Sequence, residues 1–265
     1  MSQPIRPSHL IKPKTGPDDP ELQETLHEGL RQVAPDDVVQ LTHELLARRE
    51  RLLPALAVLA SGSRPAPPLE QQLVAALAVT SKQARAAESL LQQLSASTVL
   101  PILLSDTRPV EERLVRVVTG CGAVDQRLAL EVATGLLHLL APGQYWLWTR
   151  WLWDIRHNTG ILPLLASSTH AVQADDIGTQ YRQLGAVIAI GAELGRNSGL
   201  LPSPLADDPE RGPFATDAFL AIAYSVYLYG ITNWRLSREF NRLLPPLPDL
   251  ARRLLGLPRP ARAIA

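Results

Sequence analysis

Apolar residues recur at every third or fourth position along most of this chain, which is the spacing of one face of an α-helix. Behind Asp19 and Pro20, an N-cap followed by a proline at the first helical position, three leucines repeat four positions apart and predict a helix near 20–33. From Asp36 a second apolar stripe runs along one face, with arginines on the other. It predicts a helix that Pro54 kinks or ends.

Further helices are predicted where this spacing continues between glycine and proline breaks. Ser81 and Thr216 are the expected N-caps of two of them. The apolar run at 99–104 contains Pro101 and has no second strand-like run to pair with, so a helical turn is expected there as well. The other predicted helices span about 69–79, 82–96, 109–119, 124–140, 144–156, 176–195, 216–244 and 248–256. The expected fold is therefore all-α, an irregular bundle of about ten helices with no predicted strand and no fixed repeat period.

Proline-rich stretches divide the chain into the expected domains. Residues 1–17 contain four prolines and few apolar residues, which predicts a flexible arm. The Gly-, Ser- and Pro-rich stretch 61–68 is the clearest linker, and it separates a small N-terminal helical part at 18–62 from a main helical domain at 67–256. Residues 257–265 are expected to form a basic, flexible tail.

Composition narrows the class of protein. With 265 residues, 46% of them hydrophobic and 20% charged, the chain lies in the range of ordinary globular proteins. Its formal net charge is zero, so no overall field favours nucleic acid or a membrane. A single cysteine excludes an intramolecular disulfide, and no signal-peptide pattern is found, so a cytoplasmic protein is expected. Residues 218–234 are uncharged, but their three tyrosines and the preceding Asp217 favour a helix buried in protein over a membrane span.

Four of the five tryptophans lie close together in the predicted helix at 144–156. On a helix these rings would cover most of the circumference rather than one face. Rings of this size suit a core seam, a protein interface or a platform on which a base or ligand stacks. The candidate interface residues are Tyr145, Trp146, Trp148, Trp151 and Trp153.

A polar run directly follows the tryptophans. Asp154, Arg156 and His157 form the best local cluster of ionisable groups, and such a cluster could hold a ligand, bind a phosphate or supply a general base. The alternative is that Arg156, His157 and Gly160 cap the end of the preceding helix.

Other candidate chemistry is incomplete. His43 and Glu44 begin a zinc-binding pattern, but Ala47 stands where the second histidine would be needed. His138 lies among leucines, where a hydrogen-bonded core imidazole is expected rather than a catalytic partner for Cys121. No metal and no cofactor are therefore expected.

Two sets of basic residues could contact nucleic acid. The hairpin at 69–96 has the spacing of a helix-turn-helix with Lys82 and Arg85 on its second helix, although Glu88 and Ala78 depart from that pattern. An ordinary helical hairpin is the alternative. The second set belongs to the C-terminal helices, where a solvated helix face is the alternative. It comprises Arg235, Arg238, Arg242, Arg252 and Arg253.

These patterns favour a non-catalytic helical interaction subunit that docks on another protein subunit through the tryptophan-rich helix or the long helix at 216–244. Nucleic-acid binding within a nucleoprotein complex is the second hypothesis. An enzyme centred on Asp154, Arg156 and His157 is the third.

Overall fold

The computed structural model describes residues 20–96, 99–104, 107–120, 122, 124–154, 156–157, 159–165, 176–235 and 245–258. Over these residues the chain forms twelve helices and no β-strand, which confirms the expected all-α fold. The helices are α1 (Pro20–Arg31), α2 (Pro35–Ala60), α3 (Pro67–Leu77), α4 (Ser81–Ala96), α5 (Val99–Leu104), α6 (Val110–Gly120), α7 (Gln126–Leu140), α8 (Leu162–Leu165), α9 (Ile177–Asn197), α10 (Ser203–Ala206), α11 (Gly212–Arg235) and α13 (Leu247–Leu254).

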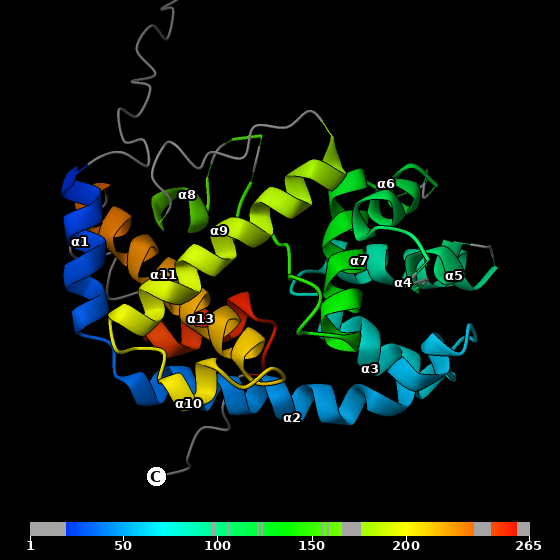
Figure 1. Ribbon diagram of the computed structural model, residues 1–265, viewed down its shortest axis with the longest axis horizontal. Helices are drawn as coiled ribbons and strands as arrows, with labels where there is room; N and C mark the ends of the chain where they lie inside the picture. Colours follow the sequence, from blue (N-terminus) through cyan, green and yellow to red (C-terminus); the bar gives the residue numbers. More distant parts are fainter. Residues whose placement is uncertain are drawn as a thin grey trace, which may run out of the picture.

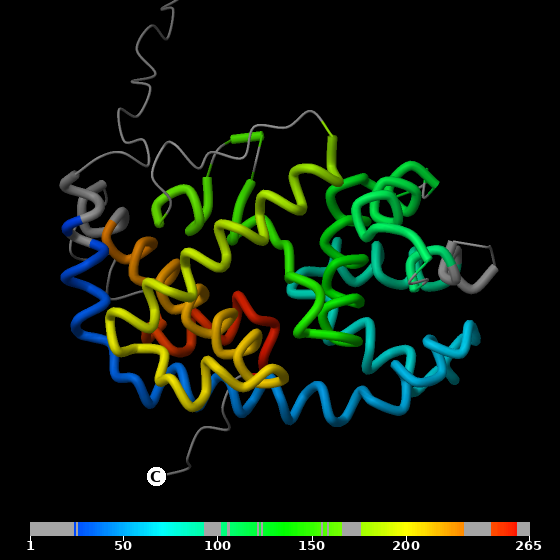
Figure 2. The backbone as a smooth tube through the Cα atoms, in the orientation of Figure 1, coloured from blue at the N-terminus to red at the C-terminus, as the bar shows by residue number. Residues whose placement is uncertain are grey.

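Helix α2 runs along one edge of the molecule and joins two groups of helices (Figure 1). Helices α3 to α7 gather at one end of it, and α1, α11 and α13 gather at the other. Helix α9 crosses between the groups and contacts α6 as well as α11. The segment after α7 leads from one group to the other, as the tube in Figure 2 shows. An irregular stretch of chain therefore lies between packed helices.

Helix α2 continues through Pro54 to Ala60, so this proline does not end it. A proline inside a helix removes one backbone hydrogen bond, which favours a break. Here the side chains before and after the proline are held in the core, because Leu52, Ala55 and Leu56 are all at most 3% exposed, whereas Pro54 itself faces solvent. Tertiary packing thus outweighs the local preference.

Two predicted N-caps are wrong by a few residues. Helix α4 is capped by Thr80 rather than Ser81, since the Gln83 backbone N–H donates to Thr80 Oγ1 (3.2 Å) and Gln83 Oε1 accepts from the Thr80 N–H (3.0 Å). This reciprocal pair is a capping box, which Ser81 has no glutamine or glutamate to complete. Helix α11 begins at Gly212, and the Thr216 hydroxyl donates to the Gly212 carbonyl one turn earlier instead of capping the helix.

A continuous core joins both groups of helices. Leu41 and Leu45 of α2 belong to the same cluster of buried residues as Phe219 of α11 and Leu136 of α7. The expected burial of α11 on all sides is confirmed for its first half, because residues 218–223 are at most 1% exposed. Within the described residues, no helix combines the length and the apolar character needed to cross a membrane. The proposed division into two domains at 61–68 stays a prediction.

Candidate functional site

The described residues of the tryptophan segment, which spans residues 141–161, form an irregular stretch and not a helix, so the helix predicted at 144–156 is wrong. Helix α7 ends before Pro142 and Gly143, and side chains from neighbouring helices then satisfy the backbone of the segment. The Trp146 N–H donates to the Tyr181 hydroxyl (2.8 Å), and the Trp148 N–H donates to Thr134 Oγ1 (3.3 Å). Because these partners lie on α9 and α7, backbone groups that isolated turns such as that at 149–153 leave unpaired are satisfied without a continuous helix.

The rings of the segment point in different directions, and most serve the core. Tyr145, Trp148 and Trp153 are 8%, 7% and 2% exposed, which leaves them too little surface to anchor a partner. Trp146 and Trp151 are half-buried. On a helix the rings would cover most of the circumference, whereas the irregular backbone places each ring separately. The expected interface is thus restricted to Trp146 and Trp151.

A tight turn follows the tryptophans and replaces the expected helix C-cap. Asp154 and Thr159 pair as an antiparallel bridge, with Asp154 N–H donating to the Thr159 carbonyl at 2.7 Å. Asp154 Oδ1 accepts from the Arg156 N–H (3.1 Å), and Oδ2 lies 2.9 Å from His157 Nδ1. Gly160 closes the turn with a φ of +121°, a conformation that side chains rarely adopt. The polar run therefore forms a turn whose aspartate fixes the position of Arg156.

Glu131 of α7 ties this region to α4. Its carboxylate is 7% exposed, and Oε2 accepts from Gln83 Nε2 at 2.7 Å. Oε1 accepts from both the backbone N–H (3.2 Å) and Nε (3.1 Å) of Arg150. A buried carboxylate with three donors is fully compensated, so Glu131 holds the tryptophan segment in place.

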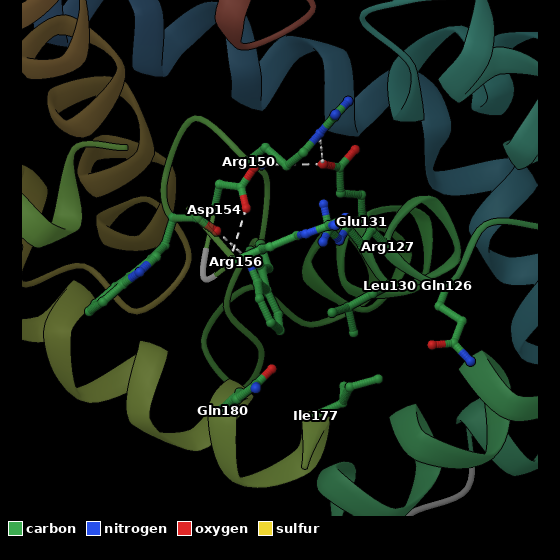
Figure 3. A pocket seen from close by; sticks show the side chains of 11 residues that line it. Gln126, Arg127, Leu130, Glu131, Arg150, Asp154, Arg156, Ile177 and Gln180 are labelled. Carbon is green, nitrogen blue, oxygen red and sulfur yellow. Dashed lines mark hydrogen bonds and ion pairs between the residues drawn. The ribbon is translucent and has the colours of Figure 1, made fainter. Parts of the chain in front are cut away.

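The arginine pocket is a cavity of about 290 Å³ between α7, the tryptophan segment and α9. Three arginines line it: Arg127 from the first turn of α7, Arg150 from the tryptophan segment and Arg156 from the turn (Figure 3). Its apolar walls include Leu130, Trp148 and Ile177. Asp154 and Arg156, the residues of the predicted polar site, both line the pocket, whereas His157 is exposed and does not.

The charges around the arginine pocket leave an excess of positive charge. Arg150 is paired with Glu131, and Asp154 with His157. Burial raises the pKa of Asp154, but the contact with His157 and the nearby charge of Arg127 outweigh it and lower that pKa overall, so the carboxylate stays ionised. The guanidinium groups of Arg127 and Arg156 make no ion pair or hydrogen bond with the part of the chain that the structure describes. The pocket can therefore accept an anion.

Sequence reasoning missed two residues that matter here. No sequence pattern identified Arg127 as a site residue, because a single arginine in the first turn of a helix is common. Asp217 was noted only as a charge before an apolar run, yet its Oδ2 lies 2.8 Å from Nε2 of the buried His138. His138 Nδ1 lies 2.7 Å from the Tyr145 carbonyl oxygen, in keeping with the expected core imidazole.

The basic residues of the nucleic-acid hypothesis lie on separate helices. Lys82 and Arg85 are exposed at the start of α4, and Glu88 is exposed near them. The guanidinium of Arg252 donates to Glu44 (Nε to Oε2, 3.0 Å), and Arg253 faces solvent. Arg238, Arg242 and Cys121 fall outside the described residues, as does the side chain of Arg235. Across the described ranges no group of three or more His, Cys, Asp or Glu side chains is placed to hold a metal ion.

Comparisons with known proteins do not assign the chain to a family. No protein-family model, no curated protein and no solved structure matches it.

Proposed function

We propose that this protein binds a small organic anion in the arginine pocket. The observation that carries the proposal is the presence of two guanidinium groups, those of Arg127 and Arg156, that line one cavity without a carboxylate of their own among the described residues. A guanidinium presents its N–H groups in a planar fork that matches the oxygens of a carboxylate or phosphate. Two such forks in one pocket favour a ligand with at least one anionic group.

The size and walls of the pocket restrict the ligand further. Its volume of about 290 Å³ lies near the lower end of the range of roughly 300–1,000 Å³ that is typical of small-molecule sites. Leu130, Trp148 and Ile177 supply apolar surface beside the arginines. A ligand that combines an anionic group with a small apolar or aromatic body fits this arrangement best.

The preorganisation of the pocket also supports binding. Arg156 is fixed through the turn that Asp154 nucleates, and Arg127 follows Asp125, whose side chain caps α7 by accepting from the Arg127 and Leu128 N–H groups (3.1 and 3.2 Å). Both backbones are thus held before a ligand arrives, which reduces the entropy lost on binding.

Replacement of Arg127 or Arg156 with methionine should weaken anion binding. Phenyl phosphate serves as the probe, and the fluorescence of Trp148 reports its arrival. Because a hydrogen bond to a charged group contributes about 1.5–3 kcal/mol, each single variant should bind at least about tenfold more weakly, and the double variant should not bind measurably. Added salt should weaken binding by the wild type as well.

Arg85→Met is the matched control, because Arg85 is an exposed arginine on α4 that does not line the pocket. It should leave the dissociation constant unchanged. Equal losses in the Arg85 and Arg127 variants, or no binding of phenyl phosphate, benzoate or inorganic phosphate by the wild type, would contradict the proposal.

Association with another protein subunit is a second proposal, supported by an aromatic row on the surface. The rings of Trp151, Tyr224 and Tyr227 follow one another at 6.2 and 5.8 Å between centroids, and all three are half-buried. Tryptophan and tyrosine are the residues on which interfaces most often depend.

If a partner covers the aromatic row, Trp151→Ser should release the protein from the complex found in its native cells. The change is measured by gel filtration of untagged protein, where the wild type elutes with its partner and the variant elutes as a monomer. Leu53→Ser, which removes an exposed leucine of α2, should not change the elution. A monomeric wild type would contradict this second proposal.

A further inference from the structure

A second and smaller cavity, here called the inner chamber, lies where α2, α4, α7, α11 and the tryptophan segment meet. Its volume is about 50 Å³. Six polar side chains from five different elements line it: Arg48, Gln83, Glu131, His138, Thr149 and Asp217. A cavity this small rarely gathers so many buried polar groups unless they have something to bind.

Arg48 has donors that the protein leaves unused. Its Nη1 donates to the Leu255 carbonyl at 2.7 Å, but its Nε is buried and has no partner among the described residues. Burial lowers the pKa of Arg48 to about 10, although the charge of Asp217 opposes this effect, so the guanidinium remains charged at neutral pH. A buried donor without an acceptor lowers the stability of the folded protein, and a charged donor lowers it further.

The His138 and Asp217 pair adds no free negative charge to the chamber. The Tyr145 carbonyl can only accept, so Nδ1 of His138 must carry a proton. Nε2 then faces the Asp217 carboxylate, and a neutral ring would set its lone pair against that oxygen. In the imidazolium form Nδ1 donates to the Tyr145 carbonyl, and the positive charge of the ring lies beside the Asp217 carboxylate and balances it.

The other groups of the chamber are also balanced or neutral. Both oxygens of Glu131 are occupied, by Gln83 on one side and Arg150 on the other. The Thr149 hydroxyl is buried and has no hydrogen-bond partner in the described protein. Glu131 is paired with Arg150, and Asp217 is paired with His138. Among the charged side chains that line the chamber, Arg48 is therefore left with a positive charge that no unpaired carboxylate balances.

We propose that the inner chamber binds one small planar oxyanion on the Nε side of Arg48, with the Thr149 hydroxyl as a second donor. The fork of a guanidinium matches a carboxylate, bicarbonate or nitrate ion. A single water needs roughly 10–15 Å³ of such volume, so about 50 Å³ holds an anion of only three or four non-hydrogen atoms. The ligand class therefore differs from that of the arginine pocket, and the two proposals stand independently.

The test measures the melting temperature of the 265-residue protein in increasing sodium acetate or sodium nitrate at constant ionic strength. Arg127→Met/Arg156→Met is the background, so that the arginine pocket does not contribute. Saturable stabilisation is expected, because an anion that binds only the folded state raises its stability by mass action.

Arg48→Lys keeps the charge but removes the fork, and it should weaken acetate binding by about tenfold or more. Thr149→Val preserves the shape of the side chain and should weaken binding several-fold even if the lysine variant does not fold. Two results would overturn the proposal: equal acetate affinity in the background and in both variants, or a high-resolution crystal structure in acetate that shows only water in the chamber.

Discussion

Asp217→Ala is expected to destabilise the protein by about 3–5 kcal/mol, the usual effect of removing one partner from a buried ion pair. The Asp217 and His138 side chains are 7% and 5% exposed, so solvent does not replace the lost carboxylate. The charged imidazole would then have to lose its proton or remain unpaired in the core. Urea unfolding measures the change as a shift of the midpoint at constant slope.

The same pair predicts a dependence of stability on pH. Burial alone would lower the pKa of His138, but Asp217 and the Tyr145 carbonyl outweigh burial and the charge of Arg48, and the pKa is raised above its ordinary value of 6.5. A raised pKa in the folded state means that the pair stabilises fully below pH 6.5 and loses this contribution as the pH rises through the folded value.

Asp217→Asn is the matched control for both the predicted loss of stability and its predicted dependence on pH. Its amide keeps the shape of the carboxylate and can donate to a neutral imidazole, so the loss should be smaller than for alanine. The difference in unfolding free energy between the wild type and this variant should shrink as the pH is raised above neutral. A difference that is independent of pH would show that His138 is not charged in the folded protein.

Gly160→Ala should destabilise the protein by about 3 kcal/mol and weaken binding in the arginine pocket, because strain and a backbone clash act together. The φ of Gly160 is +121°, and an added Cβ would lie 2.5 Å from the Leu152 carbonyl oxygen. That oxygen accepts from the Leu162 N–H at 3.0 Å, so it cannot move away without breaking a hydrogen bond. The turn that carries Arg156 would have to open.

The Gly62→Ala variant measures the effect of backbone strain in the absence of a steric clash. Gly62 also has a positive φ, +79°, but an added Cβ there meets nothing within 4 Å. The alanine variant should lose only about 1 kcal/mol and should leave anion binding unchanged. Unfolding in urea and the phenyl phosphate titration measure both effects. Equal losses at the two glycines would mean that the turn tolerates movement of Leu152.

Glu131 links the two cavities, since it lines both the arginine pocket and the inner chamber. Its partner in the pocket is Arg150, and its partner on the other side is Gln83, which also completes the cap of α4. The two sites are therefore separated by the Glu131 side chain, whose carboxylate oxygens both accept hydrogen bonds. An anion that approached Arg150 would compete with Glu131 for the same guanidinium.

Most of the secondary structure followed from local pattern. The spacing of apolar residues located α1, α3, α4, α6, α7, α9 and α13 to within a few residues, and the break at Pro142 and Gly143 located the end of α7. Asp154 and Arg156 were also identified as a polar site, because ionisable residues in a short run attract attention without any knowledge of the fold. These features depend on interactions between residues close in sequence.

The tryptophan segment shows where local pattern was insufficient. Its apolar spacing resembles that of a helix, but Tyr181 and Thr134 supply hydrogen bonds that make a helix unnecessary, and they lie on other elements. The same holds for Pro54 in α2, where burial of its neighbours maintains the helix.

The sites themselves were decided by tertiary structure. Arg127 and Arg156 are far apart in sequence, and packing of the tryptophan segment against α7 brings them into one pocket. His138 and Asp217 come from different helices, and only their burial together makes the charge state of one depend on the other. Periodic burial specifies helices because neighbours along the chain set it, whereas a binding site requires distant side chains to meet, and the packing of those helices determines which ones do.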